Sequence, residues 1–221
     1  MRTYKITLTG LTPLLMHHDN IDWADEMRRW REDPGNKKSS VAGDDRSPAC
    51  TWLGSLYHDG KRIAMPADNL MRCCMEGGAQ VPVPGGKNGK TFKAQTQSGM
   101  VLADEFLPVV LGKKTIDVAP ILKLRSEKDF GVHAKVVRDS GFSLFVKRAP
   151  VGKSKHVRVR PRFDGWSLTG TLDVWDEQLT IAALKDILKF AGAYKGLGDW
   201  RPSSRTPGPF GRFEATVEEI G

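Results

Sequence analysis

The stretch from Gly192 to Phe213 most constrains the fold of this chain, because it holds five glycines and three prolines. Cations and aromatic side chains stand between them: Lys195, Arg201, Arg205 and Arg212 with Tyr194, Trp200 and Phe210. Glycine admits positive φ and close backbone approach, while proline holds turns open. Since the stretch separates a helical pattern from a final strand pattern, we expect a loop on a rigid frame that approaches a bulky anion.

The frame itself is predicted from the spacing of apolar residues. Alternation of apolar and polar positions predicts strands, at residues 2–10, 100–111, 132–146, 156–162 and 166–175 and in a last segment that begins at Phe213. Asp59-Gly60 suits a tight turn, so residues 51–64 are predicted to form a hairpin.

Two helices are predicted from their start signals. Pro66 opens the first, which runs to Gly77-Gly78 with Asp68 or Asn69 as its N-cap. Thr180 caps the second, whose apolar stripe consists of Ile181, Leu184, Leu188 and Ala191.

The order of these elements predicts an α+β fold. Its outer elements fit a ferredoxin-like (RRM-like) β-α-β-β-α-β layer: an antiparallel sheet with helices on one face and long inserted loops or a β-hairpin. We expect a single domain over residues 1–221, with flexible loops at about 33–48 and 82–99 and a basic hairpin at about 132–163.

Positive charge is concentrated in one part of the chain. Residues 121–162 hold twelve Lys or Arg against three acids, an excess of nine, whereas the whole chain has a net charge of +8. Within this segment His156, Arg158, Arg160 and Arg162 alternate with Val157 and Val159, which predicts a strand with a row of guanidiniums on one face. Such a segment is typical of a polyanion-binding surface; a solvated basic face is the alternative.

Other features of the composition argue against membrane-spanning, secreted and disulfide-rich classes of protein. No run of apolar residues reaches the length of a membrane span, and the N-terminus lacks the apolar core of a signal peptide, so we expect a cytoplasmic protein. Cys50, Cys73 and Cys74 make no C-x-x-C pair and are interpreted as reduced core thiols.

Two further candidate sites, for small ligands or catalysis, have less support in the sequence than the polyanion-binding segment. Residues 85–91 end in Gly-Lys-Thr, but Pro84 stands where a phosphate-binding P-loop needs glycine, so no nucleotide cofactor is expected. His17, His18, Asp19 and Asp22 could act in acid/base chemistry. We expect no metal site, because no second His or Cys cluster completes a coordination shell.

Single-stranded nucleic acid is the partner that unites these features. The basic segment supplies phosphate contacts, the glycine-rich loop supplies close backbone approach, and Trp200 and Phe210 supply faces on which unpaired bases stack. The alternative for Trp200 and Phe210 is packing under the loop.

Two stretches resemble the RAMP superfamily, the RNA-binding proteins of CRISPR effector complexes. Gly196-Leu197-Gly198 followed by residues 208–213 is similar to that family's C-terminal glycine-rich loop, and residues 63–70 to its strand-to-helix segment. The resemblance implies a guide-RNA-binding subunit with a basic hairpin near residues 147–162 as a thumb. Some members of the family cut RNA. The resemblance therefore implies Asp19 or Asp22, or else His17 or His18, as candidates for RNA cleavage by this chain.

We therefore predict an RNA-binding subunit of a CRISPR-type ribonucleoprotein, without a membrane partner. Its partners would be guide RNA or single-stranded DNA, and other subunits or copies of itself. The alternatives are a stand-alone single-stranded DNA-binding protein and an endoribonuclease. The predicted nucleic-acid-binding residues are Lys147, Arg148, Lys153, Lys155, Arg158, Arg160, Arg162, Lys195, Gly196, Gly198, Trp200, Arg201, Arg205, Phe210, Gly211 and Arg212.

Overall fold

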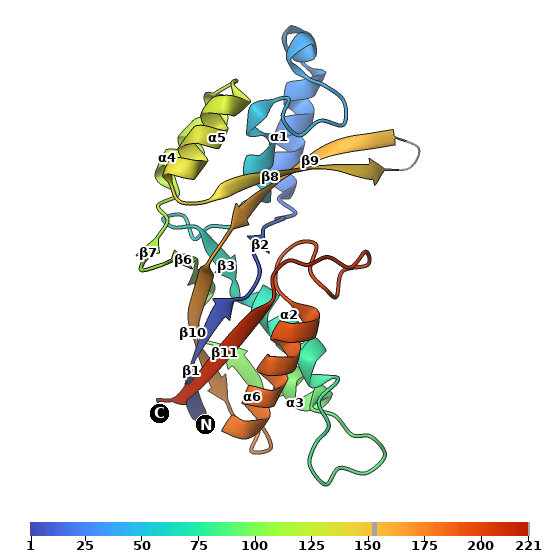
Figure 1. The fold of residues 1–221 in the computed structure, drawn as a ribbon, viewed down its shortest axis with the longest axis vertical. Coiled ribbons are helices and arrows are strands. Elements are labelled where there is room, and N and C mark those ends of the chain that lie inside the picture. The colour runs from blue at the N-terminus through green and yellow to red at the C-terminus, as the bar shows by residue number, and fades with distance from the viewer. Residues whose placement is uncertain (152–153, 221) are drawn as a thin grey trace. The chain divides into compact units, whose positions relative to one another are not determined.

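The chain forms two compact units that alternate along the sequence, as a computed structural model describes for residues 1–151 and 154–220 (Figure 1). Unit 1 comprises residues 1–14, 64–115 and 164–221, and unit 2 comprises residues 15–63 and 116–163. Each unit thus unites segments that lie far apart in the sequence. The single-domain organisation stays a prediction for the chain as a whole.

Unit 1 is built on an antiparallel sheet with β1 (Arg2–Gly10) between β10 (Trp166–Val174) and β11 (Phe213–Glu219). The alternating Tyr4, Ile6 and Leu8 are buried, as their period of two requires of a strand with one apolar face. On its other edge β10 pairs with β4 (Met100–Leu102) and with β6 (Val110–Leu111), which continues to β7 (Lys114–Thr115). The strands predicted at residues 2–10, 166–175 and from Phe213 are confirmed.

The helices α2 (Ala67–Gly78) and α6 (Ile181–Phe190) of unit 1 contact each other through small residues. A Cβ on Gly77 would lie 2.9 Å from the Ile187 carbonyl oxygen, so only glycine permits this approach. The Thr180 hydroxyl caps α6 by accepting from the Ala183 amide at 3.2 Å, as predicted. The predicted cap of α2 is wrong, because Pro66 occupies the N-cap position and no side chain caps the helix.

The region between these helices contains shorter elements than the pattern predicts. Residues 100–111 form β4, β5 (Phe106–Pro108) and β6, separated by turns, and β5 pairs with β3 (Ala64–Pro66). Between β4 and β5 the Asp104 carboxylate accepts a hydrogen bond from the Thr171 amide at 2.7 Å. In the predicted loop 82–99 the structure contains α3 (Lys93–Ser98).

Unit 2 packs short helices against a three-stranded sheet of order β2-β9-β8. These elements are β2 (Leu14–Leu15), α1 (Ile21–Glu32), η1 (Pro34–Ser39), η2 (Ala49–Ser55), α4 (Ala119–Leu122), η3 (Lys123–Ser126), α5 (Phe130–Asp139), β8 (Ser143–Val151) and β9 (Ser154–Phe163). Phe142 stacks on Phe163 in the core, with ring centroids 4.8 Å apart. The Trp52 indole donates to His133 Nδ1 at 3.0 Å, and burial lowers the pKa of His133.

Two of the predicted elements of unit 2 are wrong. Residues 132–139 are helical, because the Asp129 carboxylate caps α5 and the buried His133 and Val137 are spaced by one helical turn. The basic hairpin consequently begins at Ser143. Residues 49–55 form a 3₁₀ helix, so the predicted hairpin at 51–64 is reduced to one bridge between His58 and Ile63.

No helix among the described residues is both long and apolar enough to cross a membrane.

Candidate nucleic-acid interface

The hairpin of β8 and β9 in unit 2 lines up cations on one of its faces. Lys147 lies opposite Arg158, Phe145 opposite Arg160, and Ser143 opposite Arg162. Directly opposite residues of an antiparallel pair share a face of the sheet. The predicted row of arginines is thereby joined by a cation and an aromatic ring from β8. We call Phe145, Lys147, Arg158, Arg160 and Arg162 the cationic ribbon face.

The remaining predicted cations of this hairpin are placed differently. Arg148 lies opposite Val157 and Lys155 opposite Pro150, one residue out of step with the ribbon face. Because successive side chains of a strand alternate, Arg148 and Lys155 belong to the opposite face. Lys153 lies outside the described residues.

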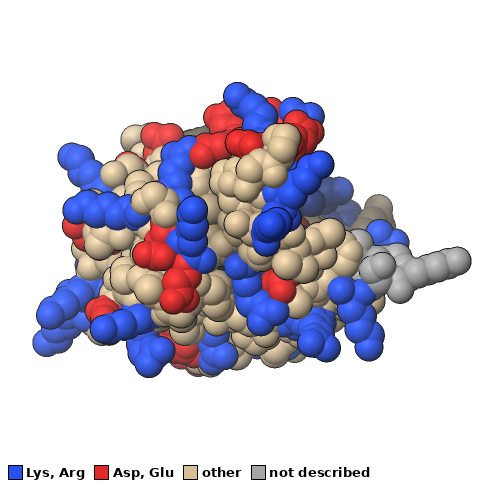
Figure 2. All heavy atoms as spheres, turned by 90° about the horizontal axis from the view of Figure 1, so that it is seen from above, with Lys and Arg blue, Asp and Glu red and all other residues tan. Residues whose placement is uncertain are grey.

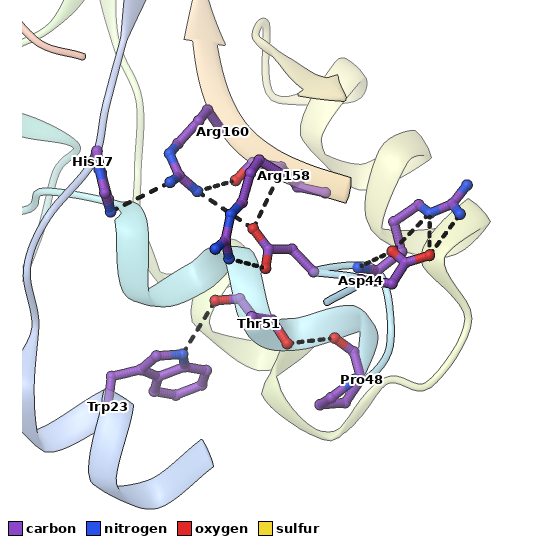
Figure 3. Close-up of polar contacts among 10 residues, drawn as sticks. His17, Trp23, Asp44, Pro48, Thr51, Arg158 and Arg160 are labelled. Atoms are coloured by element: carbon purple, nitrogen blue, oxygen red, sulfur yellow. Dashed lines mark hydrogen bonds and ion pairs between the residues drawn. The ribbon is translucent and has the colours of Figure 1, made fainter. Parts of the chain in front are cut away.

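An acidic residue that the sequence analysis missed, Asp45, binds the central arginines Arg158 and Arg160; both arginines are labelled in Figure 3. Asp45 Oδ1 lies 3.2 Å from Arg158 Nη1, and its Oδ2 lies 3.5 Å from Arg160 Nη1. Oδ2 also accepts from the Val159 amide at 3.2 Å. The guanidinium row is therefore partly neutralised within the protein.

The segment that carries Asp45 is held against the edge of β9 by backbone hydrogen bonds. The Asp45 amide donates to the Val157 carbonyl at 2.9 Å, and the Val157 amide donates to the Gly43 carbonyl at 2.7 Å. The predicted loop at 33–48 thus contacts the strand that carries the arginines. No local pattern signals this contact, since the two segments are more than 100 residues apart in sequence.

Asp44 forms a separate pair on the same segment. Its carboxylate accepts from Arg46, with Arg46 Nη2 2.7 Å from Asp44 Oδ2. This hydrogen bond to Arg46 lowers the pKa of Asp44. Adjacent carboxylates therefore have different partners, Arg46 for Asp44 and the β9 arginines for Asp45.

A cavity of about 270 Å³ within unit 2 brings several of the candidate residues together. Arg160 Nη2 donates to His17 Nε2 at 3.3 Å, which requires a neutral His17 with its proton on Nδ1 (Figure 3). The His18 ring stacks on Tyr57 with centroids 4.7 Å apart. The cavity is lined by His17, His18, Asp19, Asn20, Trp23, Ala24, Met27, Arg31, Asp45, Thr51, Gly54, Ser55, Arg158 and Arg160.

Asp22, the fourth candidate for acid/base chemistry, lines another cavity together with Glu26, Arg29 and Trp30. The structure thus unites His17, His18 and Asp19 and separates Asp22 from them. Among the described residues, no three His, Cys, Asp or Glu side chains are grouped so that they could hold a metal ion.

The glycines of the Gly192–Phe213 segment, in unit 1, permit close contacts inside the segment itself. Gly196, Gly198 and Gly211 have positive φ. The Leu197 amide donates to the Gly211 carbonyl at 2.9 Å, and a Cβ on Gly211 would lie 1.8 Å from the Leu197 oxygen. The close approach that the sequence predicts toward a ligand is, in this structure, an approach of the segment to itself.

The aromatic residues of this segment pack against each other. Trp200 and Phe210 have ring centroids 5.4 Å apart, and Phe210 is buried. Trp200 has a φ of 46°, and a Cβ on Gly208 would lie 2.1 Å from its carbonyl oxygen. Phe210 therefore packs under the loop, which is the alternative that the sequence analysis left open.

The cations of the segment divide into anchored and exposed side chains. Arg201 donates to Ser203 Oγ at 3.0 Å and to the Gly198 carbonyl at 3.2 Å, and Arg212 donates to the Ala193 carbonyl. Lys195 Nζ lies 5.9 Å from the Phe190 ring centroid. Arg205 is exposed.

Charge is distributed unevenly between the two units. Unit 2 holds 20 Lys and Arg against 13 Asp and Glu, a net charge of +7, whereas unit 1 holds 14 against 13, a net charge of +1. Figure 2 shows that Lys and Arg are spread over the viewed surface with Asp and Glu among them. The excess charge of the protein therefore belongs to unit 2.

No protein-family model matches this chain, and no curated protein matches it significantly.

Proposed function

We propose that this protein binds single-stranded RNA, as a subunit of a ribonucleoprotein, through the cationic ribbon face. The observation that carries the proposal is the register of β8 and β9, which sets Lys147 directly opposite Arg158 with Arg160 and Arg162 along the same face. A phosphate backbone that follows this face can contact cations of both strands at once, which favours a polyanion as the partner.

The features of the ribbon face favour a single strand over a duplex. Phe145 stands among the cations, opposite Arg160. An aromatic ring beside phosphate-binding cations suits unpaired bases, which stack on aromatic side chains, whereas bases in a duplex are already stacked on one another.

The proposed fold of unit 1 is ferredoxin-like. Along the chain its main elements follow the order β1, α2, β4, β10, α6, β11, and the strands lie in the order β11-β1-β10-β4. This arrangement supports a β-α-β-β-α-β unit with an antiparallel sheet. It also supports the resemblance to the RAMP superfamily, since the glycine-rich segment connects α6 with β11 and Met65-Pro66 precedes α2.

The test is the salt dependence of binding to a fluorescently labelled, unstructured RNA. We expect the double variant Arg158→Ala, Arg160→Ala to weaken affinity about tenfold for all sequences alike, because phosphate contacts carry no sequence information. The slope of log affinity against log salt should fall by about 0.7 for each phosphate that the variant no longer binds. An unchanged slope would contradict the proposal.

Two controls make this test specific. Removing both arginines leaves Asp45 without its cations. Lys147→Ala is therefore measured in parallel, because this variant keeps the ion pairs of Asp45 with Arg158 and Arg160. The matched control is Lys113→Ala, Lys114→Ala, two exposed lysines of unit 1 at the turn that leads from β6 into β7, for which we expect little change.

Nucleic acid that copurifies with the protein decides between the alternatives. RNA of uniform length supports a guide, and tight binding of single-stranded DNA without such RNA supports a stand-alone DNA-binding protein. Cleavage of the labelled RNA would favour an endoribonuclease, with His17, His18 and Asp19 in one cavity as the residues to substitute.

A further inference from the structure

We propose that Arg158 and Arg160 form a phosphate-binding site that Asp45 occupies when nucleic acid is absent. The Asp45 carboxylate then competes with a phosphate group of the ligand for the two guanidiniums. This inference rests on the proposed function, because it specifies where one phosphate of the bound strand is held and what limits its affinity.

The contacts of Asp45 correspond to those that a phosphodiester makes. Each of its two oxygens faces a different arginine, at 3.2 Å from Arg158 and at 3.5 Å from Arg160. A phosphodiester likewise has two non-bridging oxygens and a single negative charge. Both anions satisfy the planar N–H donors of guanidinium groups.

The distances show that Asp45 does not use the full capacity of the arginines. Charge-assisted N–H···O bonds are typically about 2.7–2.9 Å long, and a carboxylate can pair with one guanidinium through two parallel bonds. Asp45 instead makes one contact to each arginine, both longer than this range. A phosphate that pairs with Arg158 through two parallel bonds would therefore bind that arginine more strongly than Asp45 does. Arg160 also donates to the Val159 carbonyl and contacts His17, so Arg158 is the principal contact.

The site borders the cavity of unit 2, and Arg158 is its most exposed member. Asp45, Arg158 and Arg160 all line this cavity, and the Arg158 side chain is 39% exposed, whereas that of Arg160 is 14% exposed. Arg31 adds a further cation to the same cavity, and Asp19 adds an acid. An arriving phosphate thus meets three arginines and two carboxylates, of which Asp45 contacts the arginines directly.

Asp45 is buried, with a relative exposure of 8%, and its backbone is held separately from its carboxylate. The amide of Asp45 donates to Val157, and that bond does not involve the carboxylate. What the carboxylate gives up on leaving is the Val159 amide at 3.2 Å and the two ion pairs. The purely structural alternative, in which Asp45 only neutralises the arginines, predicts no gain in binding when its charge is removed.

The test compares Asp45→Asn with Asp44→Asn, its neighbour paired to Arg46. Both variants remove one negative charge from the same segment, and the new amide at position 45 retains an oxygen that can accept from the Val159 amide. We expect Asp45→Asn to bind single-stranded RNA about three- to tenfold more tightly with a nearly unchanged salt slope, because the same phosphate contacts the arginines in both proteins. For Asp44→Asn we expect a change of less than about twofold, because Asp44 is paired with Arg46 rather than with Arg158 or Arg160.

Equal or weaker binding by a folded Asp45→Asn variant overturns the inference while leaving the proposed function intact. If that variant does not fold, Asp45→Ser takes its place, because its hydroxyl also accepts a hydrogen bond without carrying charge. Folding of each variant is checked by thermal unfolding, with circular dichroism as the signal.

A second arm separates this inference from the proposed function. If the wild-type protein binds neither RNA nor single-stranded DNA, the proposed function fails. Inorganic phosphate is then titrated into Asp45→Asn and Asp44→Asn and followed by isothermal titration calorimetry. Tighter phosphate binding by Asp45→Asn alone supports the site, and equal binding by both variants overturns it.

Discussion

At the scale of residues, the sequence predicts which side chains are buried better than it predicts which charges are paired. Cys50, Cys73 and Cys74 are free and buried, which confirms their interpretation as core thiols. Arg158 and Arg160 do lie on one face of a strand, as their alternation predicts. Their partner Asp45 could not be predicted, because an ion pair between distant segments leaves no periodic signal in either of them.

The buried thiols provide a test of the packing of unit 1. Burial raises the pKa of Cys74 to about 12 and that of Cys73 well above its usual value. Since the thiolate is the reactive form, both thiols stay protonated and unreactive from pH 7 to pH 9. We expect a thiol-specific chromogenic reagent to modify neither in the native protein and all three cysteines in urea.

Rapid modification of Cys73 or Cys74 under native conditions would contradict the burial of these thiols. Peptide mapping of the modified protein identifies which cysteine has reacted. Cys50, whose pKa is also raised by burial, serves as the comparison from unit 2.

At the scale of elements, local signals determine the regular structure and tertiary contacts determine the loops. The central strands and α6 follow from alternation and from the Thr180 cap. The prediction of a strand at residues 132–139 is wrong, because Val132, Val136 and Val137 have strand propensity while the Asp129 cap and the buried His133 favour a helix. The location of the glycine-rich segment between α6 and β11 is predicted correctly, but its close contacts are internal.

The glycine-rich segment can be tested with a matched pair of substitutions. Gly211 and Gly85 have nearly equal φ, 72° and 70°, but a Cβ on Gly211 would collide with the Leu197 oxygen whereas one on Gly85 meets nothing within 4 Å. We expect Gly85→Ala to cost about 1 kcal/mol of the free energy of unfolding, from backbone strain alone. Gly211→Ala should cost about 3 kcal/mol or more, because the collision adds to that strain.

Urea unfolding of both variants measures the difference. Similar costs for the two substitutions would show that the segment has room near Gly211 and would contradict its tight internal packing.

At the scale of the whole molecule, the net positive charge belongs mainly to unit 2, and the linear sequence shows this distribution only in part. Residues 121–162 have an excess of nine positive charges, yet the complete unit 2 has +7, since its other segment brings acids such as Asp44 and Asp45. Unit 1 is close to neutral at +1, although it contains the glycine-rich segment with its own predicted cations.

This distribution predicts unequal contributions of the two units to nucleic-acid binding. We expect Lys147→Ala, Arg162→Ala in unit 2 to lower the salt slope of RNA binding by up to about 1.4, the value for two phosphate contacts. Lys195→Ala, Arg205→Ala in unit 1 should lower it by less than half as much, because fewer cations surround them. A larger effect of the unit 1 pair would mean that the glycine-rich segment is the principal contact.

The sequence by itself determined the elements that depend on neighbours along the chain. Strand alternation, the Thr180 cap and the turn-forming glycines act over a few residues, so they can be read without the fold. The tertiary structure alone decided which residues meet: Asp45 with Arg158 and Arg160, His17 with Arg160, and Leu197 with Gly211. The physical reason is that such contacts are selected by the folding of distant segments onto one another, which leaves no periodic pattern in the sequence of either segment.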